Sequence, residues 1–92
     1  MNNVKYRSRT EIVAMILQAA SAGATKTKIM YKAYLSYTQV KEYLTFLQDN
    51  ELVKYEQGEQ LYKITQKGIK FLHSYDEISG LVAPTANGKV SF

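Results

Sequence analysis

Apolar residues recur at helical spacing in four stretches of the chain. The first stretch follows a capping box at residues 8–11 (Ser-Arg-Thr-Glu), a pattern typical of a helix start. Its apolar positions form a single stripe, made of Ile12, Met15, Ile16, Ala19 and Ala20. Gly23 follows the stripe and supplies the left-handed stop that often terminates a helix.

Two further helices are predicted close together. Thr25 caps a short helix whose inner side is formed by Ile29, Met30 and Ala33. Residues 36–39 (Ser-Tyr-Thr-Gln) are a second capping box, so the next helix begins only a few residues later. The apolar side of that helix consists of Val40, Tyr43, Leu44 and Leu47. Helices joined this tightly must cross steeply, as they do in a helix-turn-helix.

Residues 52–55 and 60–64 are short runs rich in β-branched and aromatic residues, and they flank a glycine-containing turn at 56–59. This pattern predicts one β-hairpin. Thr65 then caps a fourth helix that we expect to end at Ser79, before Gly80. Its apolar positions are Ile69, Phe71, Leu72, Tyr75 and Ile78. Gly68, in its first turn, costs about 1 kcal/mol against alanine but would let another backbone approach closely.

The predicted fold is therefore mainly α with a small β-hairpin, in the order helix, helix, helix, hairpin, helix. This is the winged helix-turn-helix arrangement, in which the third helix is presented for recognition and the hairpin is the wing. We expect a flexible N-terminus at 1–7, the domain at 8–80 and a loose tail at 81–92. A two-stranded hairpin is marginal alone, so its apolar side chains must pack on the helices, through Leu52, Val53, Leu61 and Ile64.

Charge is distributed unevenly along the chain. The 92 residues carry 12 basic and 8 acidic side chains, a formal net charge of +4. Residues 1–48 hold seven basic and two acidic side chains, whereas residues 49–92 hold five and six. A cationic first half on a neutral body suits a polyanionic partner.

Several chemistries lack the residues that they need. The chain has no cysteine and one histidine, His73, so thiolate zinc sites, disulfides and paired imidazole ligands are excluded. No paired carboxylates or phosphate-binding glycine loop stand out, and we predict neither enzymatic activity nor a cofactor. Without an apolar run long enough to span a bilayer or a signal-like N-terminus, we expect a cytoplasmic, nucleoid-associated protein.

The chain contains the segment MYKAYLSY at residues 30–37 and the segment YKITQKG at residues 62–68, which is followed by Phe71, Leu72 and Tyr75. Together these segments resemble the archaeal ArnR-like winged helix-turn-helix family. The resemblance covers about 70 residues. It implies an archaeal DNA-binding protein, either a transcriptional regulator or a chromatin-type protein, that is dimeric through its C-terminal helix. The predicted dimer contacts are Leu72, Tyr75, Ile78 and Leu81; the alternative is that these residues close the monomer core.

In a helix-turn-helix the second helix of the pair places its N-terminal residues at base edges in the major groove of double-stranded DNA. We therefore predict four base-facing residues, Tyr37, Thr38, Gln39 and Glu42, because glutamine can pair with adenine and glutamate can accept from cytosine. The predicted phosphate contacts are Lys26, Lys28, Lys32, Lys41, Thr45, Lys54 and Lys63. The wing tip is acidic, so the basic start at Lys5, Arg7 and Arg9 is a better candidate than the wing for an added contact.

Three other interpretations remain open. An architectural DNA-binding protein would share the same surface, and winged helices also serve as protein-interaction modules. RNA binding is weaker, because a helix suited to a wide major groove does not fit the narrow groove of A-form RNA. Tyrosines at helical spacing are more often core or rim residues than nucleic-acid contacts.

Overall fold

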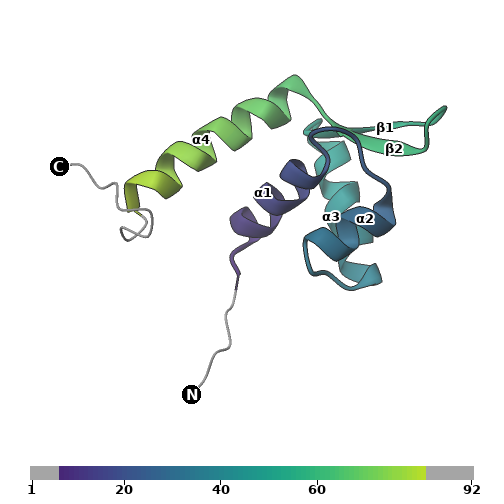
Figure 1. Ribbon diagram of the computed structural model, residues 1–92, viewed down its shortest axis with the longest axis horizontal. Helices are drawn as coiled ribbons and strands as arrows, with labels where there is room; N and C mark the ends of the chain where they lie inside the picture. Colours follow the sequence, from purple (N-terminus) through teal and green to yellow (C-terminus); the bar gives the residue numbers. More distant parts are fainter. Residues whose placement is uncertain (1–6, 83–92) are drawn as a thin grey trace, which may run out of the picture.

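A computed structural model describes residues 7–82 and gives the predicted order of elements (Figure 1). The helices and strands are α1 (Arg9–Ala19), α2 (Lys26–Lys32), α3 (Tyr37–Asp49), β1 (Val53–Glu56), β2 (Leu61–Ile64) and α4 (Gln66–Val82). The fold class, mainly helical with a two-stranded antiparallel hairpin, is confirmed. Our expectations for residues 1–6 and 83–92 lie outside the described part of the chain.

The helices begin where their capping residues predict. Ser8 and Glu11 form a complete capping box: the Ser8 hydroxyl accepts from the Glu11 N–H at 3.0 Å, and the Glu11 carboxylate accepts from the Ser8 N–H at 2.9 Å. Ser36 and Gln39 repeat this arrangement at α3. Thr25 accepts from the Lys28 N–H at 3.1 Å. These starts are local in origin, since each cap satisfies N–H groups that have no partner within the helix.

The prediction of a single apolar stripe on α1 is wrong. Val13, Ala14 and Leu17, which lie off that stripe, are buried, while Met15 and Ala19 are only half-buried. The reason is tertiary: α1 packs against both α2 and α4, as Figure 1 shows, so more than one of its sides is covered. A helix covered on several sides is apolar over more than one stripe.

Arg7, which precedes α1, stabilises the turn between α2 and α3 through hydrogen bonds. The Arg7 guanidinium donates to the backbone carbonyls of Ala33 and Tyr34, the latter at 2.9 Å. Leu35 is buried beneath the turn, and its N–H donates to the Met30 carbonyl at 3.0 Å. Arg7 therefore belongs to the folded domain, which corrects the expectation that the flexible N-terminus extends to residue 7.

The hairpin is attached to the helical body by a third extended segment that the sequence pattern did not reveal. Ala24, between α1 and α2, pairs with Tyr62 of β2 through two backbone hydrogen bonds of 2.8 and 3.0 Å. Gly23 has a φ of 89°, and a side chain there would crowd Leu61. The left-handed glycine thus turns the chain onto the edge of β2.

Within the hairpin, Lys54 pairs with Lys63 and Tyr55 with Tyr62. The Tyr55 and Tyr62 ring centroids lie 4.8 Å apart on one face. Leu52 and Val53 are buried in the core, as predicted, and Ile64 packs against it. Leu61 is only half-buried, beside Gly23.

The predicted close approach at Gly68 is confirmed. A Cβ at this position would collide with the Leu52 carbonyl oxygen and would lie 2.7 Å from Cγ1 of Ile64. The Thr65 N–H donates to the same Leu52 carbonyl at 3.1 Å, and the Thr65 hydroxyl caps α4 by accepting from the Gly68 N–H at 3.0 Å. The start of α4 is thereby fixed to the end of the α3–β1 connection.

Two expectations for α4 are wrong. The helix does not end at Ser79 but continues through Gly80 to Val82, so residues 81 and 82 are not tail. A glycine weakens a helix interior without breaking it. In addition, Ile69 is exposed, and Phe71 and Leu72 are the residues of α4 that pack on the core.

Candidate nucleic-acid interface

The outer face of α3 is the polar surface that the sequence pattern predicts. Thr38, Lys41, Glu42 and Thr45 are all exposed and lie at i, i+3, i+4 and i+7, which places them on one side of the helix. The opposite side is buried through Val40, Leu44 and Leu47. Because these apolar side chains anchor the helix in the core, its polar face points to solvent in a fixed orientation.

The structure brings side chains from α2 and α3 together at the start of α3. The Tyr37 ring lies 5.2 Å from the Lys26 Nζ and 5.5 Å from the Lys41 Nζ, measured from its centroid. Both distances are within cation–π range. Two lysines that are 15 positions apart in the sequence therefore share one site beside the exposed face of α3.

Gln39 has a structural task that affects its predicted role. Its side-chain oxygen accepts from the Ser36 N–H at 2.9 Å as part of the α3 cap. Bidentate pairing with adenine uses both the oxygen and the nitrogen of the glutamine amide. The cap occupies one of the two acceptor positions of this oxygen and fixes the direction of the amide, so the cap constrains how Gln39 can meet a base.

The lysines of α2 do not all lie together. Lys28 is exposed, and Lys26 lies beside Tyr37 of α3. Lys32 instead lines a shallow cavity of about 180 Å³ with Met15, Gln18 and Ala19, on the side of α2 that faces α1. Of the predicted lysine contacts on the helices, Lys26 and Lys41 therefore lie together at the start of α3, and Lys28 is exposed on α2.

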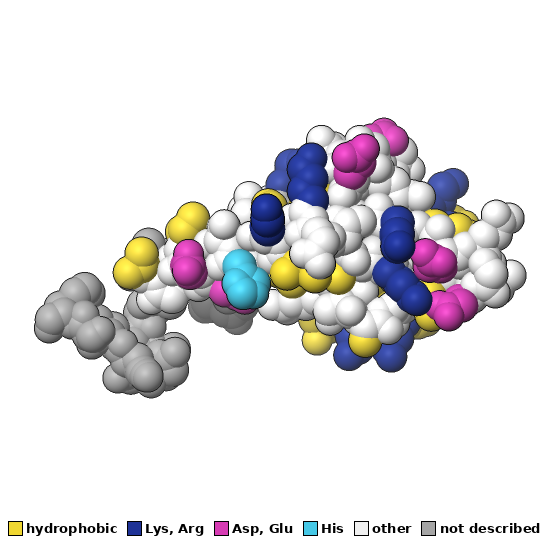
Figure 2. Space-filling model, turned by 90° about the horizontal axis from the view of Figure 1, so that it is seen from above, with side chains coloured by type: hydrophobic (Ala, Val, Ile, Leu, Met, Phe, Trp, Pro, Cys, Tyr) yellow, Lys and Arg dark blue, Asp and Glu magenta, His cyan; other side chains and the backbone are white. Residues whose placement is uncertain are grey.

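The two predicted lysines of the wing are engaged with wing carboxylates. Lys54 lies 3.3 Å from Glu56, and Lys63 lies 2.8 Å from Glu59. In Figure 2 basic and acidic side chains lie next to each other around the hairpin. The hydrogen bond and charge of Lys63 lower the pKa of Glu59, and Glu59 in turn raises the pKa of Lys63. Exposed ion pairs of this kind contribute little to stability. The two lysines and two glutamates nevertheless give the wing no net charge.

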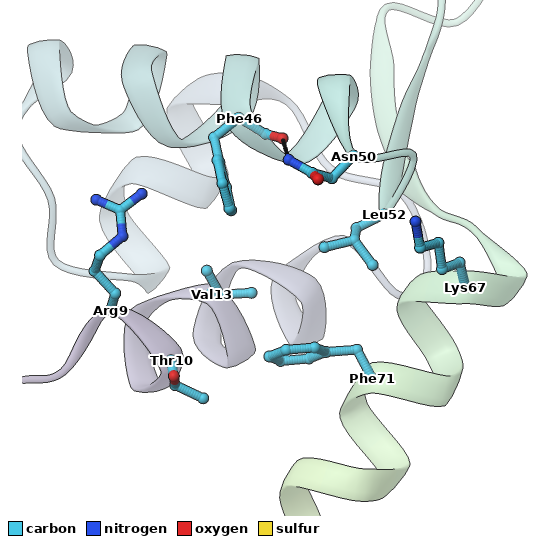
Figure 3. A pocket seen from close by; sticks show the side chains of 8 residues that line it. All are labelled: Arg9, Thr10, Val13, Phe46, Asn50, Leu52, Lys67 and Phe71. Atoms are coloured by element: carbon cyan, nitrogen blue, oxygen red, sulfur yellow. Dashed lines mark hydrogen bonds between the residues drawn. The ribbon is translucent and has the colours of Figure 1, made fainter.

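A groove separates α1, the end of α3 and the start of α4 (Figure 3). It encloses about 490 Å³ and is lined by Arg9, Thr10, Val13, Phe46, Asn50, Leu52, Lys67 and Phe71. The Arg9 guanidinium lies 5.2 Å from the ring centroids of both Tyr43 and Phe46. Arg9, predicted as an added DNA contact, thus lies against the aromatic flank of α3, away from the Lys26 and Lys41 side.

The predicted dimer residues divide into two groups. Leu72 packs against the core and Tyr75 is half-buried, lining a cavity of about 220 Å³ with Thr10, Phe71, Ser74 and Ile78. Ile78 and Leu81, in contrast, are 61% and 76% exposed. Figure 2 shows hydrophobic side chains at the surface of this far end of α4. Of the four predicted dimer residues, the two at the far end of α4, Ile78 and Leu81, are therefore the exposed ones.

Metal and membrane sites have no support in residues 7–82. No group of three or more His, Cys, Asp or Glu side chains in this part of the chain is placed to hold a metal ion. None of its helices combines the length and the apolar character that crossing a bilayer requires. His73 is an exposed residue of α4.

Three features define a winged helix-turn-helix domain, a class that typically binds DNA. They are a helix pair joined by a short turn with Leu35 buried beneath it, an outward polar face on the second helix, and a two-stranded hairpin after that helix. The chain belongs to the winged helix-turn-helix family, since the family profile of that description matches residues 6–82. Among curated proteins, none matches the sequence.

Proposed function

We propose that this protein is a transcriptional regulator that binds duplex DNA by inserting α3 into the major groove. One observation carries the proposal: the exposed stripe Thr38, Lys41, Glu42 and Thr45 adjoins the site where Lys26 and Lys41 meet at Tyr37. A polar helix face bordered by cations has the chemistry to reach base edges while its flanks hold phosphates.

The roles divide by position. Thr38 and Glu42 lie centrally on the exposed face and are our candidates for base contacts, with Tyr37 at the edge. Gln39 contributes through an amide whose direction is fixed by the α3 cap. Lys26, Lys28, Lys41 and Thr45 contact phosphates, and Lys54 and Lys63 take part only where phosphates draw them from Glu56 and Glu59.

The salt dependence of binding tests this mode directly. Each phosphate that a lysine neutralises contributes about −0.9 to the slope of log affinity against log salt. Three lysines, Lys26, Lys28 and Lys41, therefore predict a slope of about −2.7 for one subunit and roughly −5 for two. The measurement is fluorescence anisotropy of a labelled duplex titrated with the full chain at several salt concentrations. A slope near zero would exclude this mode.

A double variant identifies the surface. Lys28→Gln/Lys41→Gln should weaken binding to every duplex and make the slope less negative by about 1.8 per subunit. The matched control is Lys70→Gln, which removes an exposed lysine of α4 and should change neither quantity. Equal effects of the two replacements would place the duplex elsewhere on the molecule.

We further propose that the protein is a dimer through the far end of α4. Ile78 and Leu81 supply an exposed apolar surface there, and the cavity beside Tyr75 continues it toward α1. A two-fold dimer would place two copies of α3 in successive major grooves, about 34–36 Å apart. Ile78→Glu and Leu81→Glu should each shift the mass found by light scattering from dimer to monomer, whereas His73→Glu should not. Dimers that persist in both variants would exclude this interface.

The proposal also includes a role in regulating transcription, membership of the archaeal ArnR-like group, and a cytoplasmic location with the nucleoid. Selection of bound duplexes from a random pool separates the roles: a shared motif supports a regulator, and retained affinity without a motif supports an architectural protein. The alternative of a protein-interaction module is favoured by one observation, the charge neutrality of the wing. A protein-interaction module would show no salt-dependent retention on a column of duplex DNA.

A further inference from the structure

Three tyrosines of the helix-turn-helix are exposed to solvent. Tyr31 in α2, Tyr34 in the turn and Tyr37 at the start of α3 have 69%, 76% and 58% of their surface exposed. They follow one another at intervals of three residues. Tyr43 and Tyr62, in contrast, pack against the core. Core packing therefore accounts for the second pair of tyrosines and not for the first three, which we name the tyrosine edge.

The backbone conformation of Tyr34 gives no structural reason for a tyrosine at this position. Its φ is 55°, in the left-handed region that glycine adopts without strain and a bulky residue rarely enters. Arg7 holds this turn through bonds to the carbonyls of Ala33 and Tyr34, and neither bond depends on the Tyr34 side chain. The fold thus keeps a large exposed aromatic residue where a glycine would be more stable. Glu51, the residue after the C-cap of α3, has a similar φ of 61°, so this conformation serves to end each helix. What the helix end leaves unexplained is the large aromatic side chain at this position after α2.

The segment of the sequence that carries the tyrosine edge is basic. Residues 25–41 contain four lysines and no acidic residue. Two of these lysines, Lys26 and Lys41, place their ammonium groups beside the Tyr37 ring. A surface that combines ammonium groups with phenol hydroxyls suits phosphate oxygens, because a hydroxyl that donates to an anion forms a charge-assisted hydrogen bond. Tyrosine is among the side chains that contact DNA phosphates.

We propose that Tyr31, Tyr34 and Tyr37 form an uncharged part of the DNA interface and donate hydroxyl hydrogen bonds to the phosphates that border the groove entered by α3. This inference rests on the proposed function. It makes a separate prediction, because a neutral donor strengthens binding without neutralising a phosphate. Affinity from lysines depends on counterion release and hence on salt, whereas affinity from the tyrosine edge does not.

The experiment replaces only the hydroxyl groups. Tyr31→Phe/Tyr34→Phe/Tyr37→Phe keeps the three rings and every charge, and its binding to a short labelled duplex of mixed sequence is measured by anisotropy at several salt concentrations. We expect the Kd to rise about tenfold or more, since hydrogen bonds to charged groups are the stronger ones. The salt slope should stay that of the wild type. The control is Tyr55→Phe, an exposed wing tyrosine, which should leave the Kd unchanged.

A second variant separates function from folding. Tyr34→Gly relieves the left-handed strain, so its melting temperature should equal or exceed that of the wild type while its affinity for DNA falls. A triple phenylalanine variant that binds as the wild type does would overturn the inference, and so would a change in its salt slope. If the wild type binds with the expected slope, that failure leaves the proposed function standing. A wild type that shows no salt-dependent binding overturns both.

Discussion

Gly68→Ala tests how the fold is held together, because local and tertiary effects act in opposite directions there. In an isolated helix the replacement would stabilise α4 by about 1 kcal/mol. In the folded domain the new Cβ would collide with the Leu52 carbonyl oxygen and lie 2.7 Å from Ile64 Cγ1. The sign of the stability change therefore shows which effect is larger.

The structure allows the magnitude to be worked out. The Leu52 carbonyl cannot retreat without losing its bond from the Thr65 N–H, 3.1 Å away, and the Thr65 hydroxyl is itself tied to the Glu51 carbonyl at 2.7 Å. Overpacking costs about 1–3 kcal/mol and a lost hydrogen bond about 1 kcal/mol. After the gain in helix propensity, a net destabilisation of about 1–3 kcal/mol remains. For a domain of this size that lowers the melting temperature by about 5–20 °C.

The assay is thermal unfolding followed by circular dichroism. The matched control is Gly80→Ala in the same helix, where an added Cβ has no heavy atom within 4 Å. There the propensity gain is unopposed, and the melting temperature should rise by a few degrees, about 4 °C. If Gly68→Ala were as stabilising as Gly80→Ala, the close approach of α4 to Leu52 would be refuted.

Four further predictions concern the wing and the helix ends. Glu56→Gln/Glu59→Gln should strengthen DNA binding and steepen the salt slope by up to about 1.8, because it frees both wing lysines; an unchanged slope would place the wing away from the duplex. Lys63 lowers the pKa of Glu59 in the folded protein, so the ion pair stabilises the fold at pH values above the usual pKa of a carboxyl group. That stabilisation is lost as the pH falls through the lowered value, and the difference in melting temperature between the wild type and Glu59→Gln should vanish there. Arg7→Ala should cost about 1–3 kcal/mol by removing charged donors from the carbonyls that end α2, and an unchanged urea midpoint would contradict this. Ser36→Ala should cost about 1 kcal/mol by opening the α3 cap, which the same urea titration measures; retained stability would show that the cap is dispensable.

Features that depend on neighbouring residues were predictable from the sequence. The capping boxes at Ser8 and Ser36 specify where α1 and α3 begin, because their partners are only three residues away. The division of α3 into a buried side and an exposed side follows from its 3.6-residue period. Gly68 was also informative, since a glycine inside a helix has a cost that a close contact explains.

Features that depend on distant residues were not predictable. Nothing local indicates that Ala24 pairs with β2 or that Arg7 reaches the turn at Tyr34. The several covered sides of α1 have the same origin, since they depend on where α2 and α4 pack. Of the tyrosine edge only Tyr37 was predicted as a DNA contact; Tyr31 and Tyr34 were missed because tyrosines at helical spacing usually pack inside, and burial is decided only when the helices assemble.

The amino-acid sequence by itself determined the elements, their order and the polar face of α3, because caps, periodicity and turn residues act over a few positions. Only the tertiary structure decided which helix lysines meet and which tyrosines remain in solvent. Those outcomes depend on the packing of α2 against α3, which brings together side chains far apart in the chain. A sequence pattern within a single helix does not indicate such contacts.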